Sequence, residues 1–427
     1  MEQWLSSPNL RWVLAGCMLL GVSSGVLGSF ALLRRRSLIS DALAHAALPG
    51  VCVAFLLTGQ RSLALFLLGA LAAGLIGAFC IQAITRYSRI KEDTALGLVL
   101  SVFFGFGIVL LTRIQQSGQS SQAGLDKFIF GQAASMVGVD VRIMAACAAV
   151  VCLLSLLFFK ELKLLCFDPG FARGLGYSTL VLDGILLFLI VLAVVIGLQA
   201  VGAVLMAALL ITPAAAARLW TDRLGVMVAL SGVIGAVSGA LGTIGSTFQS
   251  GMPTGPVIVL AATAAFVFSL IFAPRRGLLS RLLRLVSLRG RVAREHALRT
   301  AYELTEAAGD WERRFTAAEF AGHRGTSPVA AARALRRLER EGSLVRFGDG
   351  YAFSKQGREA AYSVVRNHRL WEMFLMHEGQ LGADHVDRDA DLIEHLLPRD
   401  TVEELERLLR VHGRALELPP SVHPVRS

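Results

Sequence analysis

Nine stretches of about 20 apolar residues follow one another through the first 273 residues of this chain. A helix needs about 20 consecutive apolar residues to cross the hydrocarbon core of a bilayer. This repeated pattern predicts an all-α polytopic membrane protein. The predicted spans are residues 10–33, 43–59, 62–85, 94–112, 139–159, 178–197, 199–217, 224–247 and 254–273.

Charged residues gather in the last third of the chain. Residues 1–273 hold 16 Lys/Arg and 10 Asp/Glu, whereas the shorter stretch 274–427 holds 26 and 22. A composition of 54% hydrophobic and 17% charged residues excludes a wholly soluble protein. The net charge of +10 is shared by both parts, so charge alone does not indicate a nucleic-acid-binding protein. We therefore predict a membrane body followed by a soluble, charge-rich domain.

Basic residues fall on alternate loops between the predicted spans. Because cytoplasmic loops carry the excess of Lys and Arg, this alternation predicts an outside N-terminus and a cytoplasmic C-terminal domain. The first span lacks a preceding basic region and a small-residue cleavage site, so we expect it to be retained as a helix. The cytoplasmic cations are Arg34–Arg36, Arg86, Arg89, Lys91, Lys160, Lys163, Arg173, Arg218, Arg223, Arg275 and Arg276.

Small residues indicate how the spans pack. Gly21/Gly25 and Gly235/Gly239 are small-xxx-small pairs, which allow membrane helices to approach closely. The six cysteines show no CxxC spacing, so we predict small packing residues and not disulfides or a zinc site. Residues 115–137 are polar and then amphipathic, and we predict that they lie at the outer membrane surface.

Asp41 and His45 are ionisable residues in a largely apolar region. Such residues are expensive in a membrane segment and mark an ion or substrate path. The i, i+4 spacing puts both side chains on one helix face, and a carboxylate with a neutral imidazole suits first-row divalent metals. The alternative is structural: Asp41 caps the helix, and His45 bonds a neighbouring helix.

The polar connection after the fifth predicted span contains a second feature. Asp168 and Pro169 suit the N-cap and first residue of a short cytoplasmic helix, which Gly174 or Gly176 would end. Such a helix could dock a partner subunit or be an ordinary ordered loop. No GxxxxGK[ST] motif occurs in the sequence. We therefore predict that the chain is not an ATP-hydrolysing enzyme.

These motifs resemble the permease subunits of manganese, zinc and iron ABC importers. The resemblance rests on Arg34–Gly50, Glu92–Gly97, Leu125–Gly131, Asp168–Ala172, residues 201–217 and Pro253–Gly255. It implies a homodimeric permease of a bacterial inner membrane, surrounded by membrane lipid, with its path on the dimer axis. It also implies an ABC ATPase subunit and an extracytoplasmic metal-binding protein as partners.

The same resemblance assigns residues to the transport site. It implies that the transported metal passes Asp41 and His45, although Ser40 stands where relatives usually carry Gly. The ATPase would dock on the family's coupling helix, whose residues here are Asp168, Pro169, Gly170, Phe171, Ala172, Arg173, Gly174, Leu175 and Gly176.

The soluble part is predicted to begin with a winged helix-turn-helix. A basic amphipathic linker precedes three predicted helices, and Ser327 and Pro328 start the third of them. A hairpin follows, with a tight turn at 348–350, and then a long helix over about 355–377. The predicted regions are a transmembrane permease domain (1–273), the linker (274–294), a winged-helix domain (295–354) and a helical dimerisation and metal-binding region (355–427).

Two clusters of metal-ligand residues follow the winged helix. His368 and Glu372 recur at i, i+4, and further acidic and histidine residues recur at helical spacing near 391. With Leu298–Leu304 and Lys355–Ala361, they resemble the diphtheria toxin repressor family of metal-dependent regulators. The resemblance covers about 293–411 and implies a divalent metal as regulatory ligand. The ligand positions it implies are His296, His368, Glu372, Asp387, Asp391, Glu394 and His395.

The predicted recognition helix departs from that family. Val329–Ala332 occupy positions where relatives carry hydroxyl and amide side chains, and base readout needs such hydrogen-bonding groups. The candidate DNA-phosphate contacts, which would not discriminate sequence, are Arg333, Arg336, Arg337 and Arg340. We therefore expect the domain to sense metal for the transporter, and DNA is a disfavoured partner.

The leading hypothesis is the permease subunit of a divalent-metal (Mn, Zn or Fe) ABC importer with a metal-responsive regulatory domain. A membrane-anchored, metal-dependent transcriptional regulator is the alternative, but nine spans exceed what an anchor needs. A siderophore or cobalamin permease is disfavoured because the Asp41/His45 pair suits a bare ion. Asp and His ligands accept Mn, Fe and Zn alike, so the sequence does not select the metal.

Overall fold

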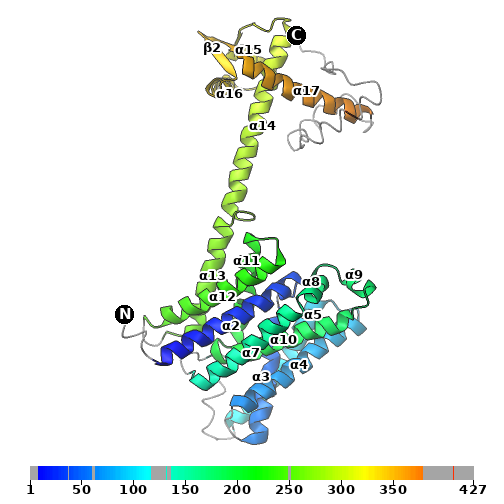
Figure 1. The fold of residues 1–427 in the computed structure, drawn as a ribbon, viewed down its shortest axis with the longest axis vertical. Coiled ribbons are helices and arrows are strands. Elements are labelled where there is room, and N and C mark those ends of the chain that lie inside the picture. Colours follow the sequence, from blue (N-terminus) through cyan, green and yellow to red (C-terminus); the bar gives the residue numbers. More distant parts are fainter. Residues whose placement is uncertain are drawn as a thin grey trace. The chain divides into compact units, whose positions relative to one another are not determined.

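The computed structural model describes residues 8–36, 38–59, 63–116, 131, 136–248, 252–377 and 407. The chain divides into two compact units, Met1–Arg281 and Leu282–Ser427, which are described in turn (Figure 1). Residues 115–137, predicted to lie at the outer membrane surface, fall largely outside the described residues.

The first unit is a bundle of long apolar helices. Within the described part of the chain, eight helices are long and apolar enough to cross a membrane, which confirms the polytopic all-α prediction. The helices of this unit are α2 (Pro8–Leu33), α3 (Ile39–Thr58), α4 (Leu63–Tyr87), α5 (Glu92–Gln116), α7 (Gly138–Leu157), α8 (Phe159–Phe167), α9 (Pro169–Gly174), α10 (Thr179–Ala200), α11 (Ala203–Trp220), α12 (Leu224–Ser246) and α13 (Thr254–Phe272).

The seventh predicted span, 199–217, corresponds to α11 and is not among these eight helices. With 18 residues, α11 is shorter than each of the eight candidate spans, which have 19 to 25 residues. Val201 and Gly202 alone separate it from α10, and Gly202 has a left-handed backbone (φ 87°) that lets the chain turn there. Helix α3 begins at Ile39, whereas the prediction began the span at residue 43, so its polar first turn belongs to the helix.

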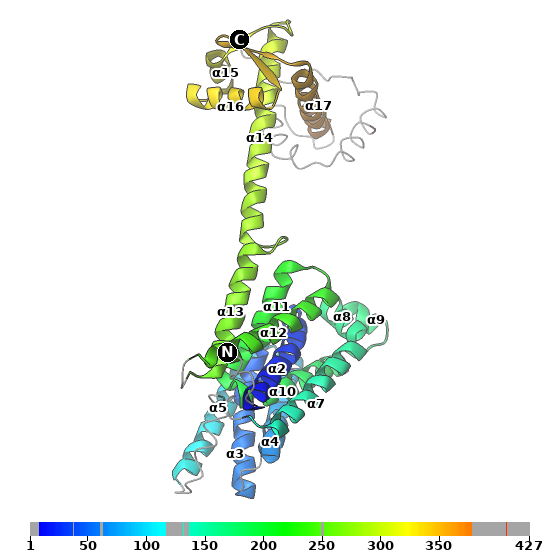
Figure 2. The same cartoon turned by 60° about the vertical axis from the view of Figure 1, so that its left-hand side comes forward.

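Helices α2 and α12 lie side by side in the bundle (Figure 2). A Cβ on Gly21 would lie 2.1 Å from the carbonyl oxygen of Gly235, so only glycine fits at this crossing. One turn along, the Ser231 hydroxyl donates to the Gly25 carbonyl at 2.7 Å. The small-xxx-small pairs predicted from the sequence are therefore partners of one another, and the small residues bring the two backbones together.

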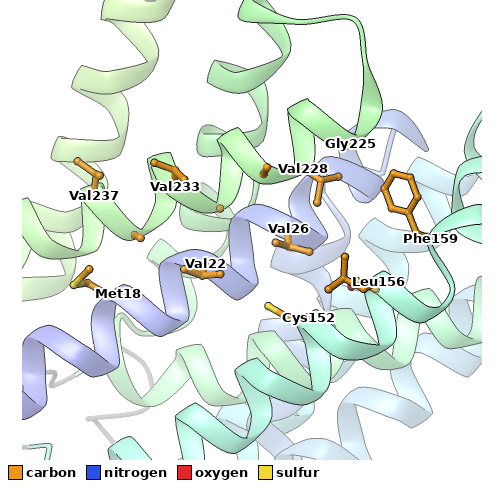
Figure 3. A pocket seen from close by; sticks show the side chains of 14 residues that line it. Met18, Val22, Val26, Cys152, Leu156, Phe159, Gly225, Val228, Val233 and Val237 are labelled. Carbon is orange, nitrogen blue, oxygen red and sulfur yellow. The ribbon is translucent and has the colours of Figure 1, made fainter.

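An apolar groove of about 710 Å³ lies beside this crossing. Side chains of α2, α7 and α12 line it, including Val22, Leu156 and Val233 (Figure 3). Its walls are almost wholly apolar, as expected for a face of a membrane protein that meets lipid chains.

The second unit contains a small sheet surrounded by helices. Its elements are α14 (Leu278–Ala307, whose first turn belongs to the other unit), β1 (Phe315–Thr316), α15 (Ala317–Arg324), α16 (Pro328–Arg340), β2 (Leu344–Phe347), β3 (Gly350–Phe353) and α17 (Lys355–His377). The strand order is β1-β3-β2, and both pairings are antiparallel, with Arg346 opposite Tyr351 in the hairpin. The helix-turn-helix α15–α16 followed by a hairpin is the predicted winged arrangement.

Local chemistry explains why the elements begin and end where they do. Thr316 and Glu319 form a capping box at the start of α15. Ser327 caps α16 with Pro328 in its first turn, and Gly342, with φ 74°, follows its end. The unit's core is formed by Leu298, Tyr302, Phe315, Phe320, Ala331, Leu335, Leu338 and Leu344.

The predicted linker and the first predicted helix of the soluble part form one continuous helix, α14. The prediction assigned residues 274–294 to the linker, but the structure starts the helix at Leu278. No proline interrupts residues 278–307, and the single Gly290 costs only about 1 kcal/mol of helix propensity. The basic stretch therefore continues the helix.

Candidate metal sites

Asp41 and His45 lie on the first two turns of α3. Leu38 is the N-cap residue and makes no side-chain cap bond, so the alternative in which Asp41 caps the helix is wrong. His45 Nε2 lies 3.5 Å from Asp41 Oδ1, and the two side chains are 17% and 34% exposed. The pair is thus accessible yet held by a helix whose remaining residues are largely buried.

The surroundings of His45 leave room for one small species. The imidazole meets the ring of Phe104 from α5 edge to face, with centroids 4.6 Å apart. A cavity of about 20 Å³ lies beside it, lined by Ala44, His45, Leu48, Val51, Phe104, Leu198 and Ala203. That volume corresponds to about one water molecule. The imidazole therefore borders a space of ionic size with apolar walls.

The pair alone does not complete a metal coordination shell. Across the described residues, no group of three or more His, Cys, Asp or Glu side chains could hold a metal ion. Divalent metals take four or more ligands. Asp41 and His45 can supply two of these ligands.

A buried ion-pair network lies just before α3. Asp183 of α10 accepts hydrogen bonds from Arg34 Nη2 at 3.0 Å and from Arg36 Nη2 at 2.9 Å. Arg36 also pairs with Glu92 at the start of α5, and Arg34 Nη1 donates to the Leu165 carbonyl of α8 at 3.3 Å. The network ties the residues that precede the metal-ligand pair to α5, α8 and α10.

Sequence reasoning did not identify Asp183 as part of a site. A signal for it was present, because it is the only charged residue within the predicted span 178–197. A charge in a membrane segment calls for a named partner. The partners lie 147 and 149 residues away in the sequence, so periodicity did not reveal them.

The predicted coupling helix is present as α9. Asp168 caps it by accepting a hydrogen bond from Phe171 N at 2.8 Å, and Pro169 is its first residue. The helix ends at Gly174, and Gly176 has φ 87°. The buried Ala172 anchors it, while its neighbours present exposed apolar side chains, namely Phe167, Phe171, Leu175 and Tyr177.

His368 and Glu372 form a buried pair on α17. His368 Nε2 lies 3.1 Å from Glu372 Oε1, and the two residues are 3% and 2% exposed. His368 Nδ1 lies 3.3 Å from the guanidinium of Arg299 on α14. His296 lies on the same helix, three residues before Arg299. The remaining predicted ligands, Asp387, Asp391, Glu394 and His395, lie outside the described residues.

Arg299 and Glu303, which sequence reasoning missed, extend this pair towards the helix-turn-helix. Arg299 Nε donates to Glu303 Oε1 at 2.8 Å, and Glu303 Oε2 lies 3.3 Å from His323 Nε2 on α15. The i, i+4 spacing of Arg299 and Glu303 is a sequence signal for an ion pair, but their link to α15 and α17 is tertiary.

The four arginines predicted to contact DNA phosphates are exposed on α16. Arg337 is paired with Glu341 at 2.9 Å, and Arg336 donates to the Ala332 carbonyl at 3.2 Å. Arg333 and Arg340 are also exposed, and so is Val329 at the start of the helix. The opposite face is buried through Ala331, Leu335 and Leu338. The exposed face is therefore basic, with an apolar start.

Comparison with known proteins assigns both units. Residues 6–273 match the ABC 3 transport family, and residues 354–414 match the iron dependent repressor, metal binding and dimerisation domain. The chain is 51% identical over 421 residues to the manganese transport system membrane protein MntC of Bacillus subtilis, covering 98% of this chain and 96% of the relative. It is 48% identical to the zinc transport system membrane protein TroC of Treponema pallidum, covering 65% of this chain and 94% of the relative.

A solved structure supports the same assignment. PsaBC from Streptococcus pneumoniae in complex with Fab matches with 33% identity and a TM-score of 0.58, covering 66% of this chain and 97% of that chain. The predicted resemblance is thereby confirmed for the membrane domain and the C-terminal domain. This chain belongs to the ABC 3 transport family of membrane permeases and carries, after its permease domain, a domain of the iron-dependent repressor type.

Proposed function

We propose that this chain carries a divalent metal ion, Mn²⁺ or Zn²⁺ in the first place and Fe²⁺ as a third candidate, past Asp41 and His45 of α3. The observation that supports this most is the pairing of the two side chains at 3.5 Å, with His45 bordering a cavity of about 20 Å³. Relatives described as manganese and zinc transport proteins support the choice of ion. A carboxylate and an imidazole bind both ions.

The arrangement of α3 suits weak and reversible binding. Asp41 lies in the first turn of α3, where the helix dipole favours a negative charge. Two protein ligands leave most of the shell to water, so an ion need not dehydrate fully. A transport site requires such weak binding because a bound ion must also leave.

The partners follow from the same proposal. The family assignment and the likeness to PsaBC support a separate ABC ATPase, an extracytoplasmic metal-binding protein and a second copy of this chain. The exposed Phe171 and Leu175 on and beside α9 would form the surface for the ATPase. The alternating basic loops support a cytoplasmic location for this helix and the C-terminal domain, with the N-terminus outside.

Metal uptake into proteoliposomes with the cognate ATPase tests the transport site. We expect Asp41→Ala and His45→Ala each to abolish uptake while the complex with the ATPase still assembles. Asp93→Ala is a matched control, because it removes an exposed first-turn carboxylate from α5 without touching the pair. Wild-type uptake by both Asp41→Ala and His45→Ala would show that the pair does not carry the ion.

The C-terminal domain is proposed to adjust transport in response to cytoplasmic metal. His368 and Glu372 form a buried O/N ligand pair, and Arg299 links it to α14. Metal binding can shift the equilibrium between two conformations of the domain only by as much as its affinities for those two conformations differ. A typical coupling of about 1–3 kcal/mol would change activity from several-fold to about a hundredfold. This is enough for feedback inhibition.

Uptake measured across a range of internal metal tests the sensing role. His368→Ala combined with Glu372→Ala should remove inhibition at high internal metal. Because both side chains are buried, the volume-conserving Glu372→Gln serves as a second variant that retains packing. Dose-response curves identical to wild type for both variants would make the domain structural and refute sensing.

A membrane-anchored transcriptional regulator is the second candidate. The exposed arginines of α16 favour contact with nucleic-acid phosphates. The exposed start of that helix, at Val329 and Ala330, offers no group that reads base edges. Nanomolar binding of the purified protein to one operator, with scrambled DNA as control at physiological salt, would favour this candidate over the sensor.

A further inference from the structure

The first part of α14 is an exposed helix with a high content of leucine. Every residue from 281 to 289 is exposed, although the stretch 278–289 contains six leucines and a valine. Leu283 and Val286 are each 61% exposed. Closer to its end, the helix is covered, since Ala297, Leu298 and Ala301 belong to the core of the second unit. Residues 278–289 are hereafter called the juxtamembrane segment.

The apolar residues of this segment share one side of the helix. At about 100° per residue, Leu278, Leu282 and Val286 form one i, i+4 row, and Leu279 and Leu283 form the next. Leu285 extends this surface. Arg281, Arg284, Ser280 and Ser287 lie on the opposite side, whereas Arg289 at the end of the segment lies on the apolar side and Leu288 on the polar side. The segment is therefore amphipathic, with an apolar face that spans nearly half of the helix circumference.

All charged residues of the segment are basic. It contains Arg281, Arg284 and Arg289, and no acidic residue occurs between Gly277 and Arg294. Arg275 and Arg276 just before it pair with Asp222 at 3.2 and 2.6 Å, which neutralises part of their charge. The partner of the segment should accordingly combine an apolar surface with negative charge.

The segment starts close to the end of a membrane span. Helix α13, a candidate span, ends at Phe272, six residues before Leu278. A connection of this length reaches at most about 20 Å even when fully extended. If α13 crosses the bilayer, the segment must begin within reach of the headgroup region.

A second copy of the segment is a poorer partner than a membrane. In a two-helix seam, Arg289 would follow Leu278, Leu282 and Leu285 at the next seam position and would be buried. Two copies would also bring arginines together without acidic residues to pair with them. A broad apolar face with Arg281 and Arg284 opposite is instead typical of helices that lie in the membrane interface. There the long side chain of Arg289 can reach the headgroups from the end of the segment.

We propose that the juxtamembrane segment lies on the bilayer surface next to α13 and binds anionic phospholipids. Its leucines would insert among the acyl chains, and Arg281, Arg284 and Arg289 would contact the headgroup phosphates. The proposal concerns only this helix and its lipid partner, and it does not depend on which ion the permease carries.

Photo-crosslinking of the full-length protein in lipid nanodiscs tests the proposal. A diazirine amino acid at Leu282 should form lipid adducts in discs that contain phosphatidylglycerol, with several-fold fewer in discs of phosphatidylcholine alone. The same probe at Ser287, on the polar side, is the positional control and should form few adducts. Protein–protein adducts at Leu282, or equal lipid labelling at both positions, would overturn the proposal.

A charge variant separates headgroup recognition from apolar insertion. Replacing Arg281, Arg284 and Arg289 with Gln should lower lipid labelling at Leu282 several-fold in anionic discs. The matched control replaces Arg333, Arg336 and Arg340 of α16, which lowers the net charge equally, and should leave labelling unchanged. Unchanged labelling in the first variant, or equal labelling of wild type in neutral and anionic discs, would refute recognition of anionic lipid.

Discussion

Replacement of Asp183 by Asn should destabilise the permease domain strongly. The carboxylate accepts hydrogen bonds from Arg34 at 3.0 and 3.2 Å and from Arg36 at 2.9 Å. The side chains of the three residues are only 10–19% exposed. Asn keeps one acceptor oxygen but removes the negative charge, so two largely buried guanidinium groups lose their shared counter-ion.

The magnitude follows from what each arginine retains. Removing one partner of a buried ion pair typically costs about 3–5 kcal/mol, because the other charge stays buried. Arg36 still pairs with Glu92, and Arg34 still donates to the Leu165 carbonyl. We therefore expect a loss of about 2–4 kcal/mol of unfolding free energy, slightly below the range for a fully orphaned charge.

Asp222→Asn is the matched control within the same chain. Asp222 also forms ion pairs with two arginines, Arg275 and Arg276, but all three side chains are about half exposed. Exposed ion pairs contribute little because water screens them. The assay is thermal inactivation of the purified protein in detergent. Asp183→Asn should lower the midpoint clearly, and Asp222→Asn should leave it near wild type.

A double mutant tests the mechanism behind the loss. If unpaired charge causes the destabilisation, Arg34→Gln combined with Asp183→Asn should be more stable than the sum of the two single variants predicts. Equal midpoints for Asp183→Asn and Asp222→Asn would refute the argument, because the buried network would then contribute no more than an exposed pair.

Three further predictions concern packing, coupling and pH. Gly235→Val should abolish folding as judged by size-exclusion chromatography, because a Cβ there would lie 2.0 Å from a carbonyl oxygen of α2. Gly97→Val is the control and should be tolerated, because a Cβ at Gly97 meets nothing within 4 Å. Phe171→Ala should lose metal-stimulated ATP hydrolysis and keep metal binding, and loss of both would argue against a coupling role. The pKa of Glu319 is lowered mainly by the hydrogen bond that its carboxylate accepts from the Thr316 backbone. The stabilisation by the ionised Glu319 is therefore complete above the usual carboxyl pKa and is lost as the pH falls through the lower pKa of the folded state. Glu319→Gln should remove that part of the pH dependence in thermal melts.

Several features of this protein could be predicted from the sequence because they depend on neighbouring residues. Hydropathy over about 20 residues locates a span regardless of what surrounds it. The capping residues Asp168 and Ser327 act on backbone groups within three residues, so the starts of α9 and α16 were predicted correctly. The Asp41/His45 pair is visible for the same reason, since one helical turn brings its two members together.

The helix boundaries that were wrong reflect the limits of that local information. The prediction for α3 began at residue 43 and left out the polar residues before it. In the folded bundle this helix begins at Ile39. The basic stretch before His296 was predicted as a linker, whereas α14 runs through it without a break. In both places helix propensity permitted either outcome, and the surrounding fold selected the longer helix.

Only the tertiary structure revealed which distant residues meet. The Gly21 and Gly235 backbones touch across α2 and α12, Asp183 joins two arginines that precede α3, and Arg299 reaches His368 from another helix. Each glycine, charge or imidazole is visible in the sequence, but periodicity encodes which face of a helix is apolar and not which helix that face meets. Packing of complementary backbones and the desolvation of unpaired charge decide the pairing, and both depend on the complete fold.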